Sequence, residues 1–509
     1  MRQFQLRVNT SLPRLAWCAR VAKDKLNVAV DCGAWVEGDA AFLCEGAWSG
    51  DYQLKGLPEA LTFTGTGAVI RQDDVIFCAP THTLQALYVL KRVDEVICSN
   101  SLAFLLQKSG DDLDLSYKAY DLDIMSIMHG LKNYGKSIPT RDRNRVYLYY
   151  HCNLKVTPTL KLLQAPKPEL QPFRDFEAYR SFIQEQITFL VKNASDPKRK
   201  SIGYSPLATV SSGYDSPACA VFGKAVGCSQ AITFSAARSG EEDSGRKIGE
   251  ILGLTVTEFE SDAYLHRTDF PEAEFLATGY GGDDLIMAAL EDELPAKLLL
   301  TGYHGDKVWG RHVKASPHIV RGDPSGASLG EFRLRVGFQN LPVPFIGCTK
   351  DESIKRISNS EEMRPWSVDN IHYDRPIPRR IAEEAGIPRH LFGQKKKAIA
   401  RPYQTTELRN PDLTRVLSST SYRMFCHFTK DKPLFTNALE KLGFSMMHAL
   451  YRFNLRLVQS VKLSSLIRKI GLTPPSSTLV SWQYSKPRTS HCLVFHWSFE
   501  RIKARYQNE

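Results

Sequence analysis

Hydrophobic and polar residues follow two different patterns along the chain. Up to about residue 160, short apolar or alternating segments are separated by Gly, Asp and Asn, which is typical of a mostly β or α+β domain. The clearest of these segments are 26–30, 68–70, 75–78 and 146–150. From 176 to 193 the apolar spacing becomes helical.

Beyond that helix, strand and helix patterns alternate. The sequence predicts strands at 206–210, 230–235 and 255–259, with helices at 217–226 and 243–252 between them. This alternation predicts a parallel sheet with helices on both faces. Ligands bind such sheets outside the carboxyl ends of the strands.

The length and the proline content suggest how the chain is divided. A chain of 509 residues is too long for one compact core, and the Pro-rich stretch 164–172 is typical of a linker. We therefore expect an N-terminal domain at 1–165, a second domain at 166–400, and a basic, mainly helical extension at 401–509.

The net charge of +11 is confined to the C-terminal extension, since the first 400 residues are close to neutral. A solvated basic face is the simpler explanation, and attraction of an anionic membrane or substrate is the alternative, whereas nucleic acid is not expected as a partner. Residues 444–470 have helical apolar spacing, which predicts a helix packed on the neighbouring domain or lying on a membrane.

Composition excludes several other classes of protein. No stretch approaches 18 uncharged apolar residues and the start lacks a signal-peptide core, so we expect a cytoplasmic protein without a transmembrane segment. The eleven cysteines are scattered without a Cys-x-x-Cys pair, which predicts neither a zinc site nor a disulfide framework.

The most informative short segment is 211–216, which reads Ser-Ser-Gly-Tyr-Asp-Ser. It joins a predicted strand to a predicted helix, so a small-residue turn would leave backbone N–H groups free where the helix N-terminus also points. This arrangement predicts a phosphate cradle in which Asp215 holds Mg²⁺. It is not a Walker A loop, because no Gly-Lys-Ser/Thr follows.

A second acidic turn lies about 90 residues further on. The apolar run 297–301 predicts a buried strand, and a Gly-rich turn after it delivers Asp306. Alone, such a turn is more often an ordinary surface feature. Together with Asp215, it predicts two carboxylates bracketing one Mg²⁺ on a triphosphate.

In order and spacing these pieces resemble the asparagine-synthetase superfamily of PP-loop ATP pyrophosphatases. The matching pieces are 211–216, Thr-Phe-Ser at 233–235, 243–253, and the Thr-Gly-x-x-Gly-Asp of 301–306. The resemblance covers about 175–400 and implies a PP-loop (HUP-like) parallel-sheet α/β synthetase domain that cleaves ATP to AMP and pyrophosphate with Mg²⁺. Ser212 and Lys307 depart from the family pattern, where Gly and Glu are usual.

The resemblance also implies the site residues. ATP contacts are expected from Val210, Ser211, Ser212, Gly213, Tyr214, Asp215, Ser216, Phe234, Ser235 and Gly302, and metal ligation from Asp215 and Asp306. Lys396, after the Arg-Pro segment 375–388, corresponds to the lysine that stabilises the acyl-adenylate. Lys395 and Lys397 flank it, so a shift by one residue stays open, as does a simple basic surface loop.

The N-terminus departs from the glutamine-using members, which carry a cysteine at position 2. Here residue 2 is Arg, which implies a degenerate, glutaminase-dead Ntn-hydrolase-like α+β domain. Members that have lost this cysteine include β-lactam and carbapenam synthetases and lasso-peptide cyclases. In the β-lactam type a tyrosine and a glutamate deprotonate the amine, and Tyr303 with Glu331 are the matching candidates. The alternative is that Tyr303 merely lines a pocket.

These expectations describe an ATP-dependent carbon–nitrogen ligase. It would adenylate a carboxylate of a small molecule or peptide and couple it to an amine, which could belong to the same substrate or to a second molecule, or be free ammonia. The alternatives are an amidotransferase subunit fed with ammonia by a separate donor, and a catalytically dead nucleotide-binding protein that serves a partner or precursor protein. The identity of the substrate is not readable from the sequence.

Overall fold

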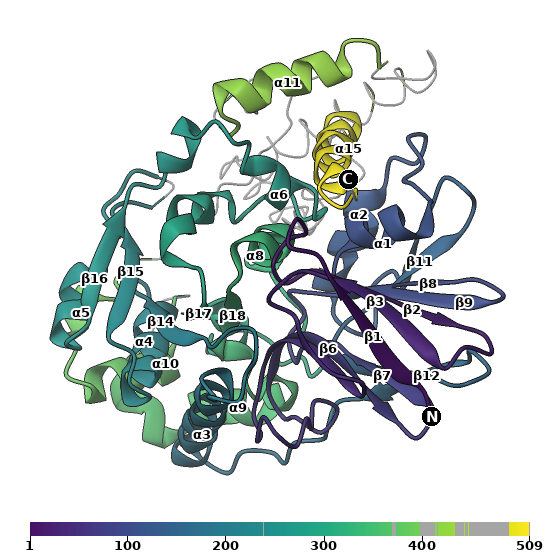
Figure 1. Cartoon of the computed structure of the whole chain (residues 1–509). Coiled ribbons are helices and arrows are strands. Elements are labelled where there is room, and N and C mark those ends of the chain that lie inside the picture. The colour runs from purple at the N-terminus through teal and green to yellow at the C-terminus, as the bar shows by residue number, and fades with distance from the viewer. Residues whose placement is uncertain are drawn as a thin grey trace, which may run out of the picture.

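The computed structural model describes residues 1–237, 239–368, 373–395, 397, 413–414, 416–432, 442, 446 and 488–507. It is a mixed α/β structure with three sheets, two in an N-terminal β-rich half and one in the remainder (Figure 1). The predicted membrane or packing helix at 444–470 and most of the 401–509 extension lie outside the described residues.

Two sheets pack face to face in the β-rich half, which has the layers of a sandwich (Figure 1). The first, in spatial order, contains β1 (Gln3–Val8), β3 (Asn27–Cys32), β2 (Trp17–Ala22), β9 (Glu95–Ser99), β8 (Leu87–Lys91), β11 (Arg145–Tyr149) and β10 (Ser137–Pro139). The second contains β13 (Leu162–Pro166), β12 (Cys152–Val156), β7 (Asp74–Cys78), β6 (Phe63–Arg71), β5 (Phe42–Trp48) and β4 (Glu37–Gly38). The alternating segments of the sequence thus form strands, because each buries one face between the sheets.

Helices cover the outer side of the first sheet. They are α1 (Leu102–Ser109), which Ser101 caps by accepting from the Phe104 amide, and α2 (Tyr120–Met125), with η1 (Ser126–His129) after it. The predicted linker at 164–172 starts too early, since β13 continues to Pro166. An edge strand tolerates that proline, which lacks an N–H to donate.

The third sheet is parallel throughout, as predicted. In spatial order it contains β16 (Thr255–Phe259), β15 (Gln230–Phe234), β14 (Ser205–Thr209), β17 (Lys297–Thr301) and β18 (Gln339–Pro342). The predicted strands fall within one residue of the observed ones, and the predicted helix at 217–226 is α4 (Asp215–Ala225), which begins two residues earlier. The helix predicted at 243–252 is shorter, α5 (Arg246–Ile251), because 243–245 are bonded to 211, 212 and 233 instead.

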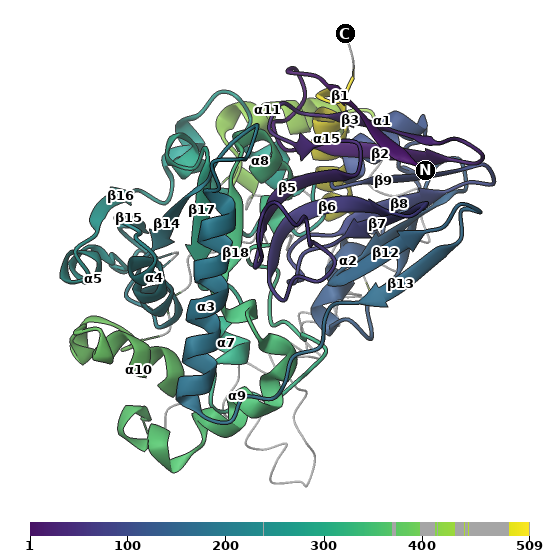
Figure 2. The ribbon, with the colours of Figure 1, turned by 60° about the horizontal axis from the view of Figure 1, so that its bottom comes forward.

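Side chains of the parallel sheet alternate between two apolar layers. Leu298 and Leu300 pack toward α4 and α3 (Phe176–Ala194), whereas Leu207 and Leu299 pack toward α6 (Glu272–Leu276) and α8 (Gly330–Val336). Figure 2 shows α3 lying lengthwise between the parallel sheet and the β-rich half, and it contacts both β14 and β5.

The remaining elements are short or lie near the C-terminus. They are η2 (Ala263–His266), η3 (Leu285–Glu293), α7 (Gly305–Val308), η4 (Ala327–Leu329), η5 (Val343–Phe345), η6 (Cys348–Lys350), α9 (Asp351–Ser358), η7 (Glu361–Trp366), α10 (Pro376–Glu384), η8 (Arg389–Leu391), α11 (Ser419–Thr429) and α15 (Arg488–Ala504). The helix α15 packs against α1, α2 and α6, so it touches both halves. Just after it, the Tyr506 ring stacks on Phe104 at 4.6 Å.

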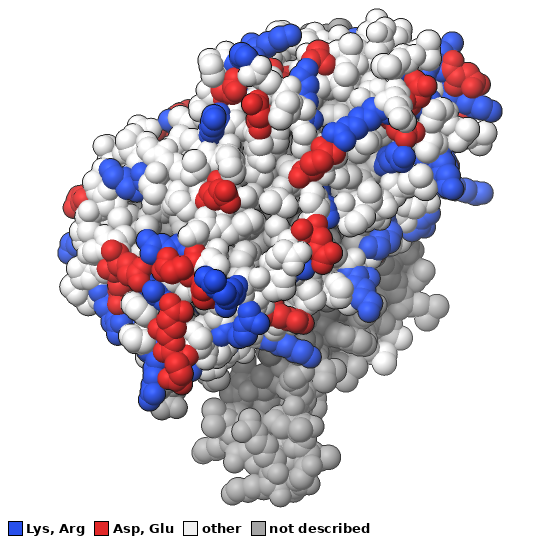
Figure 3. All heavy atoms as spheres, turned by 90° about the horizontal axis from the view of Figure 1, so that it is seen from below, with Lys and Arg blue, Asp and Glu red and all other residues white. Residues whose placement is uncertain are grey.

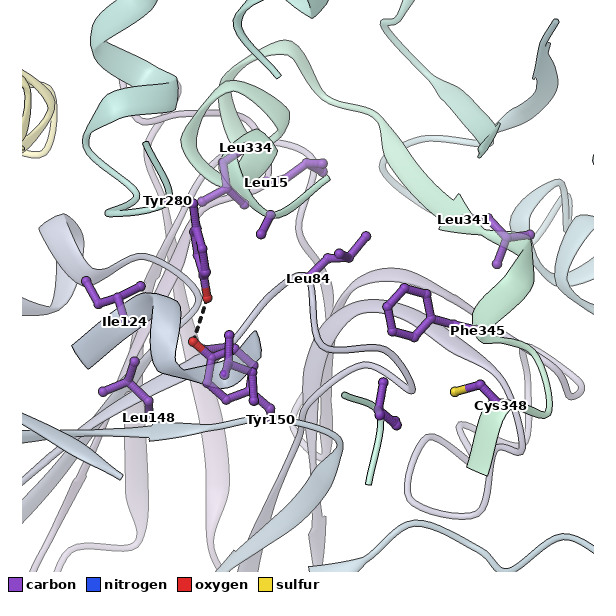
Figure 4. Packing of buried hydrophobic residues seen from close by; sticks show 14 of the residues in the cluster. Leu15, Leu84, Ile124, Leu148, Tyr150, Tyr280, Leu334, Leu341, Phe345 and Cys348 are labelled. Atoms are coloured by element: carbon purple, nitrogen blue, oxygen red, sulfur yellow. Dashed lines mark hydrogen bonds between the residues drawn. The ribbon is translucent and has the colours of Figure 1, made fainter. Parts of the chain in front are cut away.

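One apolar core runs through both halves of the molecule. Leu15, Leu84 and Tyr150 from the β-rich half meet Tyr280 and Leu334 from the other half (Figure 4). The hydroxyl groups of Tyr150 and Tyr280 are 2.7 Å apart and hydrogen-bonded within this core. A shared core of this kind fixes the halves relative to each other.

Candidate functional site

A cavity of about 290 Å³ lies at the carboxyl ends of β14, β15 and β17. From β14 the chain moves outward to β15 and β16 and then crosses back to β17 and β18, so the strand order reverses between β14 and β17. This reversal is the position where open parallel sheets bind ligands. The volume is at the low end of the range for small-molecule sites.

The loop at 211–216 forms one wall of this cavity. Its hydroxyls are tied together, with Ser211 Oγ 2.7 Å from Ser216 Oγ and 3.2 Å from the Gly213 amide that donates to it. Ser212 bonds to Asp243 twice, from its hydroxyl to the carboxylate at 2.5 Å and from its amide to the carbonyl at 3.2 Å. The expectation of free N–H groups is therefore wrong for Ser212 and Gly213. The Asp243 carbonyl accepts from the Ser212 amide, and the Ser211 hydroxyl accepts from the Gly213 amide. Asp215 and Ser216, the first residues of α4, line the cavity, and the first amides of a helix have no partner within the helix.

The second loop packs directly against Asp215. A Cβ placed on Gly302 would lie 2.6 Å from the Cβ of Asp215, and one placed on Gly305 would lie 2.7 Å from each of its carboxylate oxygens. Only residues without a side chain fit at these two points. The close approach brings Asp306, in α7, to the same cavity as Asp215.

The two predicted metal ligands are thus brought together as cavity walls. Among the described residues there is no cluster of three or more His, Cys, Asp or Glu side chains able to hold a metal ion by themselves. Two carboxylates suit Mg²⁺, which usually takes one or two protein carboxylates and completes its shell with phosphate oxygens and water.

A buried cation stands beside Asp215. The guanidinium of Arg375, which precedes α10, forms an ion pair with the Asp215 carboxylate and lies 5.0 Å from the centre of the Tyr373 ring. Burial opposes the charge on Arg375, yet the neighbouring Asp215 carboxylate raises its pKa. Arg375 therefore stays cationic at the cavity wall. Its pairing with Asp215 was not predicted from the sequence.

Of the three candidate lysines, Lys396 lies outside the described residues. Lys395 points to Glu241 in an exposed ion pair. Lys397 places its Nζ 3.0 Å from the hydroxyl of Ser212, bonds to the Glu242 carbonyl, and lines the cavity. Lys397 is thus a lysine of this segment that the described residues place at the cavity, and the prediction for Lys396 stays a prediction.

Tyr303 and Glu331 do not meet. Tyr303 lines the cavity and its hydroxyl bonds to Asp284, which also accepts from the amides of Gly326 and Ser328. Burial, together with the Asp284 carboxylate, raises the pKa of Tyr303 well above its usual value.

Glu331 belongs to a different environment, at the junction of the two halves. It accepts from the Ser101 hydroxyl and from the Tyr506 hydroxyl, each at 2.6 Å, and burial raises its pKa. The spacing along the chain predicts that Glu331 pairs with Tyr303. The Glu331 side chain, in α8, lies toward the β-rich half instead.

Most of the other predicted site residues line the cavity, and one of them lies away from it. Cavity walls include Val210, Ser211, Gly213, Tyr214, Ser216, Phe234 and Gly302. Ser235 does not line it, since its hydroxyl donates to Glu260 at 2.7 Å beyond the end of β16. The sequence reasoning missed Tyr373 and three acidic side chains on the opposite wall, Asp283, Asp284 and Asp323, which lie in segments without any recognisable spacing.

The start of the chain is also held by the fold. The Arg2 side chain is buried and donates to the carbonyls of Thr157 and Pro158, both at 3.2 Å. Ten of the eleven cysteines are buried, and Cys426 alone is exposed. Burial raises the pKa of Cys18 and Cys32, so these two N-terminal thiols stay protonated.

Charged side chains of both signs are mixed on one face of the molecule (Figure 3). On the face seen in Figure 3, basic and acidic side chains are interspersed without a field of one sign. Within the described part of the chain, no helix has the length and apolarity needed to cross a membrane. Comparison with known proteins gives no match, either to a protein-family model or to a curated protein.

Proposed function

We propose that this protein is an ATP- and Mg²⁺-dependent ligase that adenylates a carboxylate and couples it to an amine. One observation carries the proposal: the loop at 211–216 and the carboxylates of Asp215 and Asp306 line one cavity at the strand-order reversal of a parallel sheet. A loop that opens a helix at such a point is suited to polyphosphate.

The charges around the cavity suit a nucleotide and its leaving pyrophosphate. Asp215 and Asp306 would hold Mg²⁺, which supplies neutralisation of the phosphate charge when bound. Arg375 and Lys397 are fixed cations at the same end of the cavity. Preorganised cations beside developing negative charge are the main electrostatic help that this chemistry needs.

The remaining walls fit a substrate. The lining also includes apolar side chains (Ile286, Met287 and Leu290) and the Tyr303–Asp284 pair. A nucleophilic amine must be neutral, and the residue that receives its proton has to lie near the acyl-adenylate. Tyr303 coupled to Asp284 replaces Tyr303 coupled to Glu331 as the candidate for this role.

The fold is compatible with the resemblance seen in the sequence. Numbering the parallel strands by chain order gives 3-2-1-4-5, the doubly wound arrangement expected of a PP-loop domain. The two-sheet sandwich with helices outside suits a degenerate Ntn-hydrolase-like domain. Arg2 donates to two carbonyls, whereas a glutaminase of this type uses a cysteine nucleophile at that position.

ATP–pyrophosphate exchange tests the proposal. Wild-type protein is incubated with ATP, Mg²⁺, labelled pyrophosphate and a panel of carboxylates, alongside Asp215→Asn and Asp306→Asn. Exchange that depends on a carboxylate and is lost in both variants supports a ligase. Tight binding of Mg–ATP without exchange for any carboxylate supports the nucleotide-binding protein instead. Absence of both Mg–ATP binding and exchange in folded protein refutes the proposal.

A further inference from the structure

A buried lysine lies behind the loop that carries Asp306. Lys355, in α9, directs its Nζ at three backbone carbonyls, those of Lys307, Val308 (2.9 Å) and Gly310 (2.9 Å). Its side chain is 9% exposed. All three of these acceptors lie in or just after α7, the helix that contains Asp306.

The geometry suits an ammonium group, which has three donors to give. The last carbonyls of a helix have no partner within the helix and carry partial negative charge, so a cation there satisfies and stabilises them. The helix α7 has four residues and cannot hold its own shape, because helix nucleation is unfavourable for so short a segment.

The ammonium is itself anchored. Asp351 Oδ1 lies 3.8 Å from Lys355 Nζ, and Asp351 Oδ2 accepts from the Ser316 amide at 2.8 Å. Lys355 therefore connects α7 to its own helix α9 and, through Asp351, to the segment that contains Ser316. On the facing side of the loop, Gly302 and Gly305 press against Asp215.

We propose that Lys355 is a positioning residue that fixes α7 so that Asp306 faces the same metal and nucleotide as Asp215. This role rests on the proposed function. The three carbonyls that Lys355 binds belong to residues that do not line the cavity, so it acts through the placement of Asp306 rather than on the substrate.

The test compares Lys355→Met with the matched control Lys350→Met. Methionine keeps the length and the apolar stem, whereas Lys350 precedes α9 and forms an ion pair with Glu169, whose side chain is exposed. Hydrogen exchange of the amides at 305–310 reports the loop, and calorimetric titration of Mg–ATP reports the site. For Lys355→Met we expect faster exchange at 305–310 and Mg–ATP affinity reduced by about 10- to 100-fold, as for other residues that orient metal ligands. The control should match wild type in both measurements.

The outcomes separate the role of Lys355 from the ligase proposal. Folded Lys355→Met with wild-type exchange at 305–310, or with wild-type Mg–ATP affinity despite faster exchange, overturns the positioning role. If Lys355→Met does not fold, Asp351→Asn removes the anchoring charge and keeps the ammonium, and it should shift both readouts in the same direction by a smaller factor. Wild-type protein that binds no Mg–ATP refutes the proposed function itself, whatever the variants do.

Discussion

Replacing Gly305 by Ala tests whether the two loops must touch for the protein to act. The added methyl group would lie 2.4 Å from Cγ of Asp215 and 2.7 Å from both of its carboxylate oxygens, whereas ordinary contacts begin at 3.4 Å. One partner must therefore move by about 1.0 Å. Asp215 cannot retreat freely, because its other side is held by the ion pair with Arg375.

The magnitudes favour a loss of function over a loss of fold. Overpacking costs about 1–3 kcal/mol of stability, and the gain from Gly to Ala inside a helix returns up to about 1 kcal/mol. The net destabilisation is then at most about 3 kcal/mol, within the margin of a stable domain. Misplacing a reacting group by about 1 Å costs about 100-fold in rate.

The assay pairs thermal unfolding with ATP–pyrophosphate exchange. The control is Gly203→Ala, whose methyl group would meet only the Ala194 carbonyl at 3.8 Å. We expect Gly305→Ala to melt within several degrees of wild type and to lose exchange by about two orders of magnitude. Gly203→Ala should retain both. A Gly305→Ala protein with wild-type exchange would mean that Asp215 and Asp306 do not act as a pair, and the reasoning about the cavity would fail.

Two more predictions concern the junction of the two halves, and a third concerns glutamine hydrolysis by the N-terminal half. The buried Glu45 carboxylate lies 2.6 Å from the Arg333 guanidinium, and Arg333→Met leaves this carboxylate without its cation. This variant should lower the free energy of unfolding, measured in urea, by about 3–5 kcal/mol. The double variant Arg333→Met with Glu45→Gln should recover much of that loss. Burial raises the pKa of Glu331, so the folded state holds that proton more tightly than the unfolded chain does. The stability contributed by this group therefore falls as pH rises from the unfolded pKa upward. Glu331→Gln should remove this pH dependence in thermal melts between pH 4 and 8. Glutamine should yield no glutamate with wild-type protein, since residue 2 is Arg, and measurable release would contradict a glutaminase-dead domain.

Patterns that depend on neighbours in sequence predicted the fold well. Period-two alternation located the strands, and the change to helical spacing located α3 to within one residue, because both follow from which side chains are buried locally. The same patterning located both loops of the cavity, since a loop between a buried strand and a helix must lie at the carboxyl edge of a parallel sheet.

Contacts between distant segments were not predictable in this way. Arg375 and Asp215 are 160 residues apart, and nothing near either one indicates the pairing. The assignment of Glu331 to Tyr303 used distance along the chain as a substitute for distance in space. It missed that α8 faces the β-rich half, where Ser101 and Tyr506 offer hydroxyls to a buried carboxylate.

The β-rich half contributes to the cavity even though it supplies no side chain to its lining. The Thr64 hydroxyl donates to the Asn340 carbonyl at 2.6 Å, and the Asn340 side chain accepts from the Thr301 hydroxyl at 2.8 Å. Thr301 ends β17 and lines the cavity next to Gly302. A buried hydrogen-bond chain therefore runs from the second sheet of the sandwich, through β18, to the loop that delivers Asp306. The sandwich therefore supports, through Asn340 and Thr301, the loop that brings Asp306 to the cavity.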